Sequence, residues 1–230
     1  MIKSIPLSNV LFLDIETVSQ FPKWNDLSEM GQKLWDKKVH FTLSPEQTSE
    51  EAYFEKAGLY AEFGKIVCIS CGLLEKSGKL RIKSFDSSDE KTLLSEFGEM
   101  FNHPRMQNIL LCAHNGKEFD FPWISKRYII NGMTPPVPFQ SYGKKPWEIP
   151  HIDTLELWKF GNFKSTTSLE LLAHVLGIPS PKDDIDGSMV SSIYHIEKDL
   201  KRIVNYCEKD VLTLANVFCR LRQEDLLTRE

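Results

Sequence analysis

The sequence lacks a long hydrophobic run and a dense cysteine framework. Its longest apolar stretch, about residues 66–74, is interrupted by Ser70 and falls far short of the roughly 20 residues that a membrane-spanning helix needs. The N-terminal apolar stretch runs directly into Asp14 and Glu16 without a small-residue cleavage site, so we expect no signal peptide. Five cysteines, an odd number, are typical of a reducing compartment. We therefore expect a cytoplasmic protein that has no membrane partner.

The sequence also lacks a large excess of charge of either sign. The 230 residues contain 28 Lys+Arg and 32 Asp+Glu, a net charge of −4. This balance argues against a polybasic nucleic-acid binder, although a few acids gathered in one site could set the sign of the total. An apolar fraction of 41% excludes a mostly disordered chain and is sufficient for a substantial core.

Apolar runs and amphipathic stretches alternate along the chain. The Lys76-Ser77-Gly78 turn predicts an antiparallel hairpin between two of the strands, and Ser88 is a candidate helix cap. This order predicts an α/β fold with a mixed sheet flanked by helices. The expected strands are residues 10–15, 65–74, 79–85, 108–113 and 149–154, and the expected helices are residues 88–101, 121–131, 168–176 and 197–222.

Residues 19–63 separate the first two expected strands. They contain Trp24, Trp35 and two expected helices, at residues 27–37 and 45–58. We interpret this stretch as an insertion beside the core of a single domain that spans residues 1–230.

Acidic residues occupy positions where burial is expected. Asp14 and Glu16 end the first apolar strand, and because they are two residues apart they face the same side. Asp120 opens a helix after the fourth strand, where it could also act as a first-turn acid. Tyr206 and Asp210 are four residues apart in the last helix, so they share one face.

These carboxylates have a common chemical implication if they meet. Four carboxylates in one cleft repel each other, so either some stay protonated or bound cations neutralise them. Hard oxygen ligands suit Mg²⁺ or Mn²⁺, and no cysteine–histidine cluster in the sequence suggests zinc. Two such ions promote in-line hydrolysis of a phosphodiester bond.

The ordered motifs carry a resemblance to a known family. Asp14-x-Glu16-Thr17, Asn115-x3-Phe119-Asp120 and Tyr206-x3-Asp210 together resemble the three motifs of the DEDDy branch of the DnaQ-like 3′–5′ exonucleases. The resemblance extends over about residues 10–221 and is similar in kind to the proofreading domain of family B DNA polymerases. It implies a ribonuclease H-like fold, a five-stranded mixed sheet whose second strand is antiparallel.

The resemblance also implies roles for these residues. Asp14, Glu16, Asp120 and Asp210 would hold two Mg²⁺ or Mn²⁺ ions, and Tyr206 would position the attacking water. The residues expected to lie beside the substrate strand are Ile15, Thr17, Asn115 and Phe119, with Lys182 and Asp186 added from a loop that borders the cleft in similar enzymes.

Other motifs allow two interpretations. Cys68-x2-Cys71 is better explained as two core cysteines than as a metal or redox site, because strand residues three apart face opposite sides. Asp153 could support the site or cap a short helix. Residues 139–147 mix aromatic residues with lysines, a composition typical of single-strand binding but equally of an ordinary solvated loop.

Together these observations predict a two-metal 3′–5′ exonuclease that releases nucleoside 5′-monophosphates from the 3′ end of single-stranded nucleic acid, with DNA favoured over RNA. The alternatives are an RNA-trimming exoribonuclease of the same fold and a catalytically silent nucleic-acid-binding module. Residues 105–182 contain nine Lys+Arg and six Asp+Glu, so the basic excess falls on the stretch expected to border the substrate.

Overall fold

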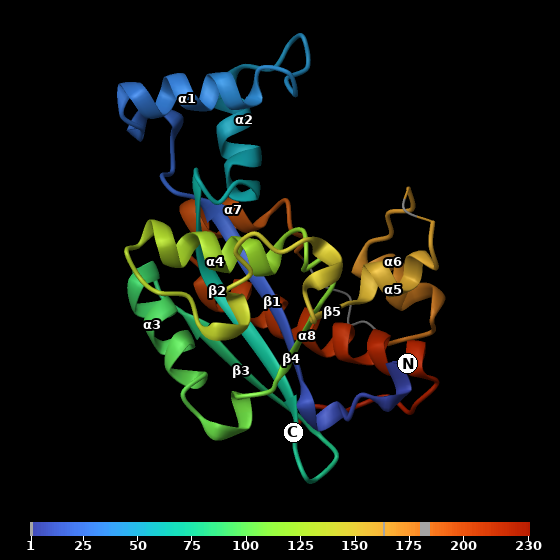
Figure 1. Ribbon diagram of the computed structural model, residues 1–230. Coiled ribbons are helices and arrows are strands. Elements are labelled where there is room, and N and C mark those ends of the chain that lie inside the picture. The colour runs from blue at the N-terminus through green and yellow to red at the C-terminus, as the bar shows by residue number, and fades with distance from the viewer. Residues whose placement is uncertain (1, 163, 180–184) are drawn as a thin grey trace.

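A five-stranded sheet forms the centre of the computed structural model, which describes residues 2–162, 164–179 and 185–230 (Figure 1). The strands lie in the order β3-β2-β1-β4-β5. β2 is antiparallel to both β1 and β3, whereas β1, β4 and β5 are parallel. The predicted mixed sheet with an antiparallel second strand is therefore confirmed. The strands are β1 (Val10–Ser19), β2 (Gly64–Leu74), β3 (Leu80–Asp86), β4 (Leu110–Ala113) and β5 (Ile152–Asp153).

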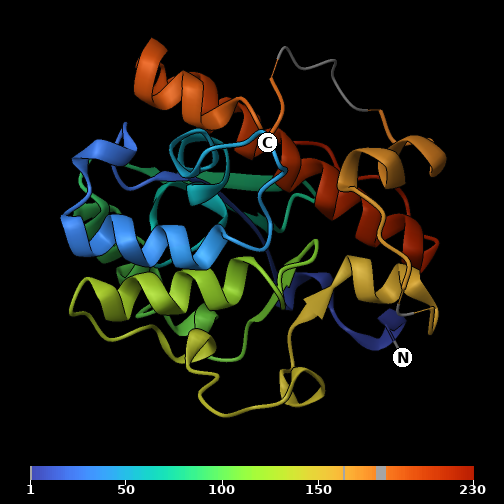
Figure 2. The ribbon, with the colours of Figure 1, turned by 90° about the horizontal axis from the view of Figure 1, so that it is seen from above.

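Helices cover both faces of the sheet. Seen from above, α4 and α8 lie on opposite sides of it (Figure 2). Alternate residues of β1 pack accordingly: Leu13 joins the core beneath α3 and α4, and Phe12 contacts Phe218 of α8 with ring centroids 5.9 Å apart. The helices of this part are α3 (Glu90–Met100), α4 (Asp120–Ile130), α5 (Thr154–Lys159), α6 (Leu169–Val175), α7 (Val190–Ser192) and α8 (Leu200–Arg222). Among the described residues, none of the helices has both the length and the apolar character needed to cross a bilayer.

Capping residues set several element boundaries that differ from the prediction. Asp89, and not Ser88, caps α3, because its carboxylate accepts the backbone N–H of Thr92 at 3.2 Å. Asp199 caps α8, which therefore begins at Leu200 instead of residue 197. β5 is two residues long because Asp153 already caps the next helix.

The insertion rises beyond the C-terminal end of β1 (Figure 1). It contains α1 (Glu29–Val39) and α2 (Ser49–Lys56), whose small core is centred on Trp35. The ring of Trp35 lies edge-on to Tyr53 and Phe63, at centroid distances of 5.3 and 5.1 Å. The hydroxyl of Thr17 donates to the carbonyl oxygen of Gly58 at 2.6 Å and so ties the insertion to β1.

A buried ion pair joins the insertion to the helices. Arg127 of α4 and Glu90 of α3 are 4% and 7% exposed, and Arg127 Nε lies 2.9 Å from Glu90 Oε1. Arg127 also donates to the carbonyl oxygen of Ala61 at 2.8 Å, and the backbone N–H of Ile66 donates to Glu90 at 2.7 Å. Because these partners satisfy both charges, the pair orients α4 relative to the end of the insertion.

Candidate active site

β1 presents two carboxylates to helix α8. Asp14 and Glu16 lie on the face of β1 that also carries Phe12, as their spacing predicts. The thiol of Cys207, in α8, donates to Asp14 Oδ2 at 3.3 Å and to the Asp14 carbonyl oxygen at 3.5 Å. Ligand atoms of Asp14, Glu16 and Cys207 all lie within 4.8 Å of one another. This pair of acids is therefore held in one place by a strand and a helix.

Asp120 lies close to Asp14 and Glu16 but belongs to another element, helix α4. The pairing of β1 with β4 ends at Phe12 and Cys112, so the later part of β1 faces the start of α4 instead of a strand. Asp120 is the first residue of α4 and only 4% exposed, and the backbone N–H of Ile15 donates to its carboxylate. The third predicted acid therefore lies against the strand that carries the first two.

The middle of α8 supplies the remaining predicted residues. Tyr206 and Asp210 are one turn apart, and the Tyr206 hydroxyl donates to the Asp210 carboxylate. Burial first, and then the charges of Asp210, Glu16 and Asp14, raise the pKa of Tyr206 well above its usual range. The hydroxyl consequently keeps its proton at neutral pH and acts as a hydrogen-bond donor.

The carboxylates destabilise each other's charges. Burial, followed by repulsion from the other three carboxylates, raises the pKa of Asp14 far above its ordinary value of 3.8. The pKa of Glu16 is raised in the same way, by burial first and then mainly by Asp210. Burial raises the pKa of Asp120 from 3.8 to about 7. A buried group of acids with such mutual repulsion fits a site for hard divalent cations, which would favour the ionised forms.

The loop before Asp120 has an unusual backbone. Asn115 adopts a left-handed conformation with φ of 60°, which Asn tolerates better than most residues. Its backbone N–H donates to Asp153 Oδ1 at 3.0 Å, and Lys117 N–H donates to Asp153 Oδ2 at 3.1 Å. Asp153 also accepts the backbone N–H groups that begin α5, so it both caps that helix and supports the loop.

Comparisons with known proteins identify the family of the chain. Residues 58–228 match the family described as "Predicted 3'-5' exonuclease related to the exonuclease domain of PolB". The chain belongs to this family. The matched range includes Asp120, Tyr206 and Asp210, whereas Asp14 and Glu16 precede it. Membership makes the chain a predicted 3′–5′ exonuclease, a hydrolase that acts on nucleic acid.

Two DNA polymerases are similar to this exonuclease over most of its length. The "DNA polymerase III PolC-type" of Ureaplasma parvum is 25% identical over 215 residues, 90% of this chain and 11% of that protein. The family B DNA polymerase of the archaeon Pyrobaculum calidifontis matches 90% of this chain and 24% of its own, with a TM-score of 0.51 and 15% identity. The second likeness confirms the ribonuclease H-like fold. The chain spans about a tenth and a quarter, respectively, of these two proteins.

Several residues predicted to lie beside the substrate have structural contacts of their own. The side chain of Ile15 is buried in the core, and the hydroxyl of Thr17 is bonded to the insertion. Phe119 is half-buried, with its ring 6.1 Å from that of Trp123. Asp186 is exposed and accepts the N–H of Ser188 at 2.8 Å within its own turn. Lys182 lies outside the described residues.

Cys207 contacts the predicted acids, but the sequence did not identify it as part of the site. The available signal was its position on the apolar stripe of α8, between Tyr206 and Asp210. The interpretation of Cys68 and Cys71 as core cysteines is confirmed: both are free and buried, and they belong to clusters on opposite faces of the sheet.

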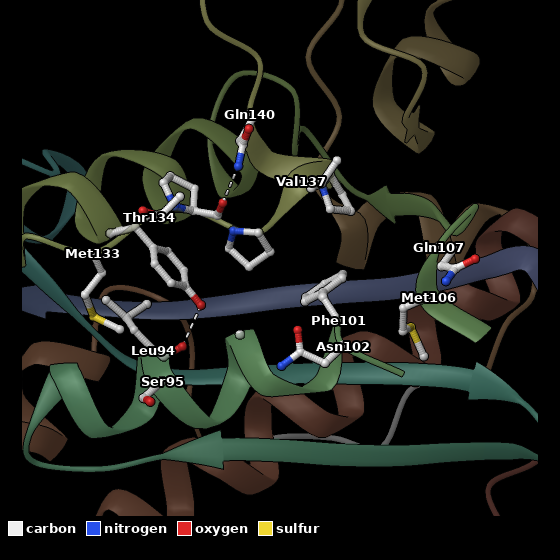
Figure 3. A pocket seen from close by; sticks show the side chains of 15 residues that line it. Leu94, Ser95, Phe101, Asn102, Met106, Gln107, Met133, Thr134, Val137 and Gln140 are labelled. Atoms are coloured by element: carbon white, nitrogen blue, oxygen red, sulfur yellow. Dashed lines mark hydrogen bonds between the residues drawn. The ribbon is translucent and has the colours of Figure 1, made fainter. Parts of the chain in front are cut away.

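A cavity lies away from the carboxylates. It has a volume of about 540 Å³ and is bounded by α3, α4 and the proline-rich segment that follows α4 (Figure 3). Among its lining residues, Tyr128 donates to the carbonyl oxygen of Leu94, and Gln140 donates to that of Pro135 at 2.7 Å. None of the residues that line this cavity is a carboxylate, so it is not the candidate active site.

Proposed function

We propose that this exonuclease hydrolyses the terminal phosphodiester bond at the 3′ end of single-stranded DNA and releases nucleoside 5′-monophosphates. The observation that carries the proposal is the convergence of Asp14 and Glu16 from β1, Asp120 from α4 and Asp210 from α8. Three elements that are far apart in sequence place four acids in one partly buried cluster. A purely structural role does not explain so costly an arrangement.

The donor set fits a pair of Mg²⁺ or Mn²⁺ ions. Carboxylate oxygens are the preferred ligands of both cations, and burial and mutual repulsion raise the pKa of Asp14 and of Glu16, an effect that a bound cation would offset. Asp14, Glu16, Asp120 and Asp210 would hold the ions. When bound, the ions supply an activated water and stabilise the charge that develops on the phosphate.

Tyr206 and the neighbouring backbone supply the remaining functions. The protonated hydroxyl of Tyr206 lies within hydrogen-bond reach of Asp210, where it can orient a water for attack in line with the leaving 3′ oxygen. That oxygen takes up a proton and becomes the new 3′ hydroxyl of the shortened strand. The arrangement of aspartates, glutamate and tyrosine corresponds to the DEDDy class.

DNA is favoured as the substrate because both similar proteins are DNA polymerases. RNA trimming is the alternative with the same chemistry.

The test is a nuclease assay on 5′-labelled DNA and RNA oligonucleotides, with Mn²⁺, Mg²⁺ or EDTA. We expect stepwise shortening from the 3′ end that requires a divalent ion and is faster on DNA. A circular single strand should remain intact. A faster reaction on RNA would assign the RNA-trimming alternative, and metal-independent shortening would refute the two-metal mechanism.

Two substitutions identify the site. Asp14→Asn and Asp210→Asn should retain the fold and lose the divalent-dependent nuclease activity, because each removes a charged ligand. The matched control is Asp86→Asn at the exposed end of β3, which makes the same change in charge. Undiminished activity in either site variant would exclude this cluster as the catalytic centre.

A further inference from the structure

Residues 139–148 form a loop that exposes aromatic rings among lysines. Tyr142 is 67% exposed and Trp147 is 76% exposed, which is unusual for side chains of this size. Lys144 and Lys145 are exposed beside them, and Lys145 Nζ lies 5.2 Å from the centroid of the Trp147 ring. Aromatic faces that alternate with ammonium groups match the chemistry of bases and phosphates on a single strand.

Local hydrogen bonds hold this loop in a defined shape. Gly143 has a left-handed backbone with φ of 67°, and Lys144 N–H donates to the carbonyl oxygen of Ser141 at 3.1 Å. The N–H of Lys145 donates to Glu148 Oε2 at 2.7 Å, and the N–H of Glu148 donates back to the Lys145 carbonyl oxygen at 2.9 Å. The rings are therefore presented on an ordered turn, which lowers the entropic cost of binding.

The base of the loop is fixed to the protein core. Phe139 is 2% exposed, and its carbonyl oxygen accepts the hydroxyl of Ser125 in α4 at 2.8 Å. His151 Nε2 donates to the carbonyl oxygen of Pro138 at 2.7 Å. Its Nδ1 accepts the N–H of Leu111, in β4. The loop is thus attached to the same helix and strand that position Asp120.

A cavity connects the loop with the catalytic elements. It has a volume of about 230 Å³, and Ser141 and Lys144 of the loop line it together with Lys117 and Phe121. Phe121 follows Asp120 directly in α4, and Lys117 belongs to the loop that Asp153 supports. A strand that leaves the carboxylates past the start of α4 would therefore meet this cavity and then the exposed loop.

We propose that the loop of residues 139–148 binds the single strand upstream of its 3′ end. Bases stack on Trp147 and Tyr142, and Lys144 and Lys145 contact the phosphates. Because every base has an aromatic face, this mode of binding tolerates any base sequence. Because the lysines contact phosphates, the affinity falls as the salt concentration rises. The assignment rests on the proposed exonuclease function for the direction of the strand, whereas binding itself is tested without hydrolysis.

Binding is measured by the fluorescence anisotropy of a 5′-labelled single-stranded DNA 12-mer, with Asp14→Asn protein in EDTA so that no cleavage occurs. We expect Trp147→Ala and Tyr142→Ala each to weaken binding roughly 5- to 100-fold, as the loss of one stacked base predicts. The double substitution K144E/K145E should also weaken binding. It should make the negative slope of log K against log salt less steep, by about 1 to 2.

Matched controls separate the loop from general surface effects. Phe41→Ala removes an aromatic side chain that is 92% exposed in the insertion, and K76E/K79E reverses two exposed lysines at the β2–β3 turn. Both control proteins should bind the 12-mer as the parent does. Loop variants that bind no more weakly than these controls would overturn the proposal.

A second readout distinguishes failure of the loop assignment from failure of the proposed function. With Asp14 intact and Mn²⁺ present, the loop variants should lose kcat/KM on the 12-mer but not on the p-nitrophenyl ester of thymidine 5′-monophosphate, which occupies only the carboxylate site. Equal losses on both substrates would overturn the loop assignment. If the unmodified protein hydrolyses neither substrate, the exonuclease proposal fails, and the binding measurements alone decide the role of the loop.

Discussion

The backbone N–H of Asn115 donates a 3.0 Å hydrogen bond to Oδ1 of Asp153. The same oxygen accepts the N–H of Leu155 at 2.9 Å, and Oδ2 accepts the N–H of Lys117 at 3.1 Å. One carboxylate, 3% exposed, therefore begins α5 and holds the loop that leads to Asp120. The sequence is compatible with a supporting residue or a helix cap at position 153, and the structure shows that Asp153 is both.

Asp153→Ala should cost about 2–4 kcal/mol of unfolding free energy, more than an ordinary N-cap, because buried N–H groups of the loop lose a charged acceptor. Exonuclease activity should fall as well, since Asp120 follows this loop. The matched control is Ser168→Ala, which removes an exposed cap of α6 with a single acceptor bond to Leu171 and should cost about 1 kcal/mol. Urea denaturation compares the two, and equal losses would show that Asp153 acts only as a cap.

Cys207 is predicted to tune metal affinity through its 3.3 Å contact with Asp14 Oδ2. Cys207→Ala should raise the Mn²⁺ concentration for half-maximal activity about 10-fold, the effect expected when a partner of a ligand is lost. Cys207→Ser keeps a donor and should restore most of the affinity. Cys219→Ala serves as the control because it truncates another fully buried cysteine of α8. A shift of the same size in the Cys219 variant would assign the effect to packing.

The main elements of the fold were predictable because each has a local cause. The first four residues of the central strand β1 are apolar and lead directly into its acids, and the spacing of Tyr206 and Asp210 places them on one face of a helix. The predicted β5, residues 149–154, was too long because the Asp153 carboxylate begins a helix there. Local propensity alone does not reveal which of two competing hydrogen-bond patterns a short segment adopts.

Contacts between distant segments could not be predicted. The bond from Thr17 to Gly58 joins residues 41 positions apart, and that from Cys207 to Asp14 joins residues 193 apart. No periodicity in the chain encodes either contact, since both depend on how the insertion and α8 dock on β1. The resemblance predicted which acids converge, whereas the partners of those acids emerged only from the packing.

Gly116 is predicted to be intolerant of any side chain. A Cβ atom at this position would lie 2.3 Å from the Cβ of Ala113, at the end of β4, and 3.2 Å from the ring of Phe121. Gly116→Ala should therefore lower the free energy of unfolding by about 1–3 kcal/mol and displace the start of α4, which reduces activity. The control is Gly187→Ala, where a Cβ meets nothing within 4 Å. Equal thermal stability of the two variants would show that the loop relaxes without cost.

The metal-free protein is predicted to lose stability through its acids as pH rises. Burial raises the pKa of Asp120 from 3.8 to about 7, so the folded state binds this proton more tightly than the unfolded state. The resulting stability is fully present below pH 3.8 and is lost as pH rises toward about 7, by at most about 1.4 kcal/mol per pH unit. Asp14 and Glu16 contribute in the same direction, because their pKa values are raised too.

Buried histidines act with the opposite sign and have to be separated from this effect. Burial lowers the pKa of His151 and of His195, so their contribution to stability grows as pH rises. The difference in urea midpoint between the parent and Asp120→Asn, measured in EDTA, cancels the contribution of the histidines because both proteins contain them. The parent should have the higher midpoint at pH 4.5, and this advantage should shrink by pH 7.5. Saturating Mn²⁺ should reverse the trend in the parent, because the cation favours ionised carboxylates over protonated ones. A parent advantage in EDTA that grows with pH would mean that Asp120 is stabilised as an anion by the protein alone.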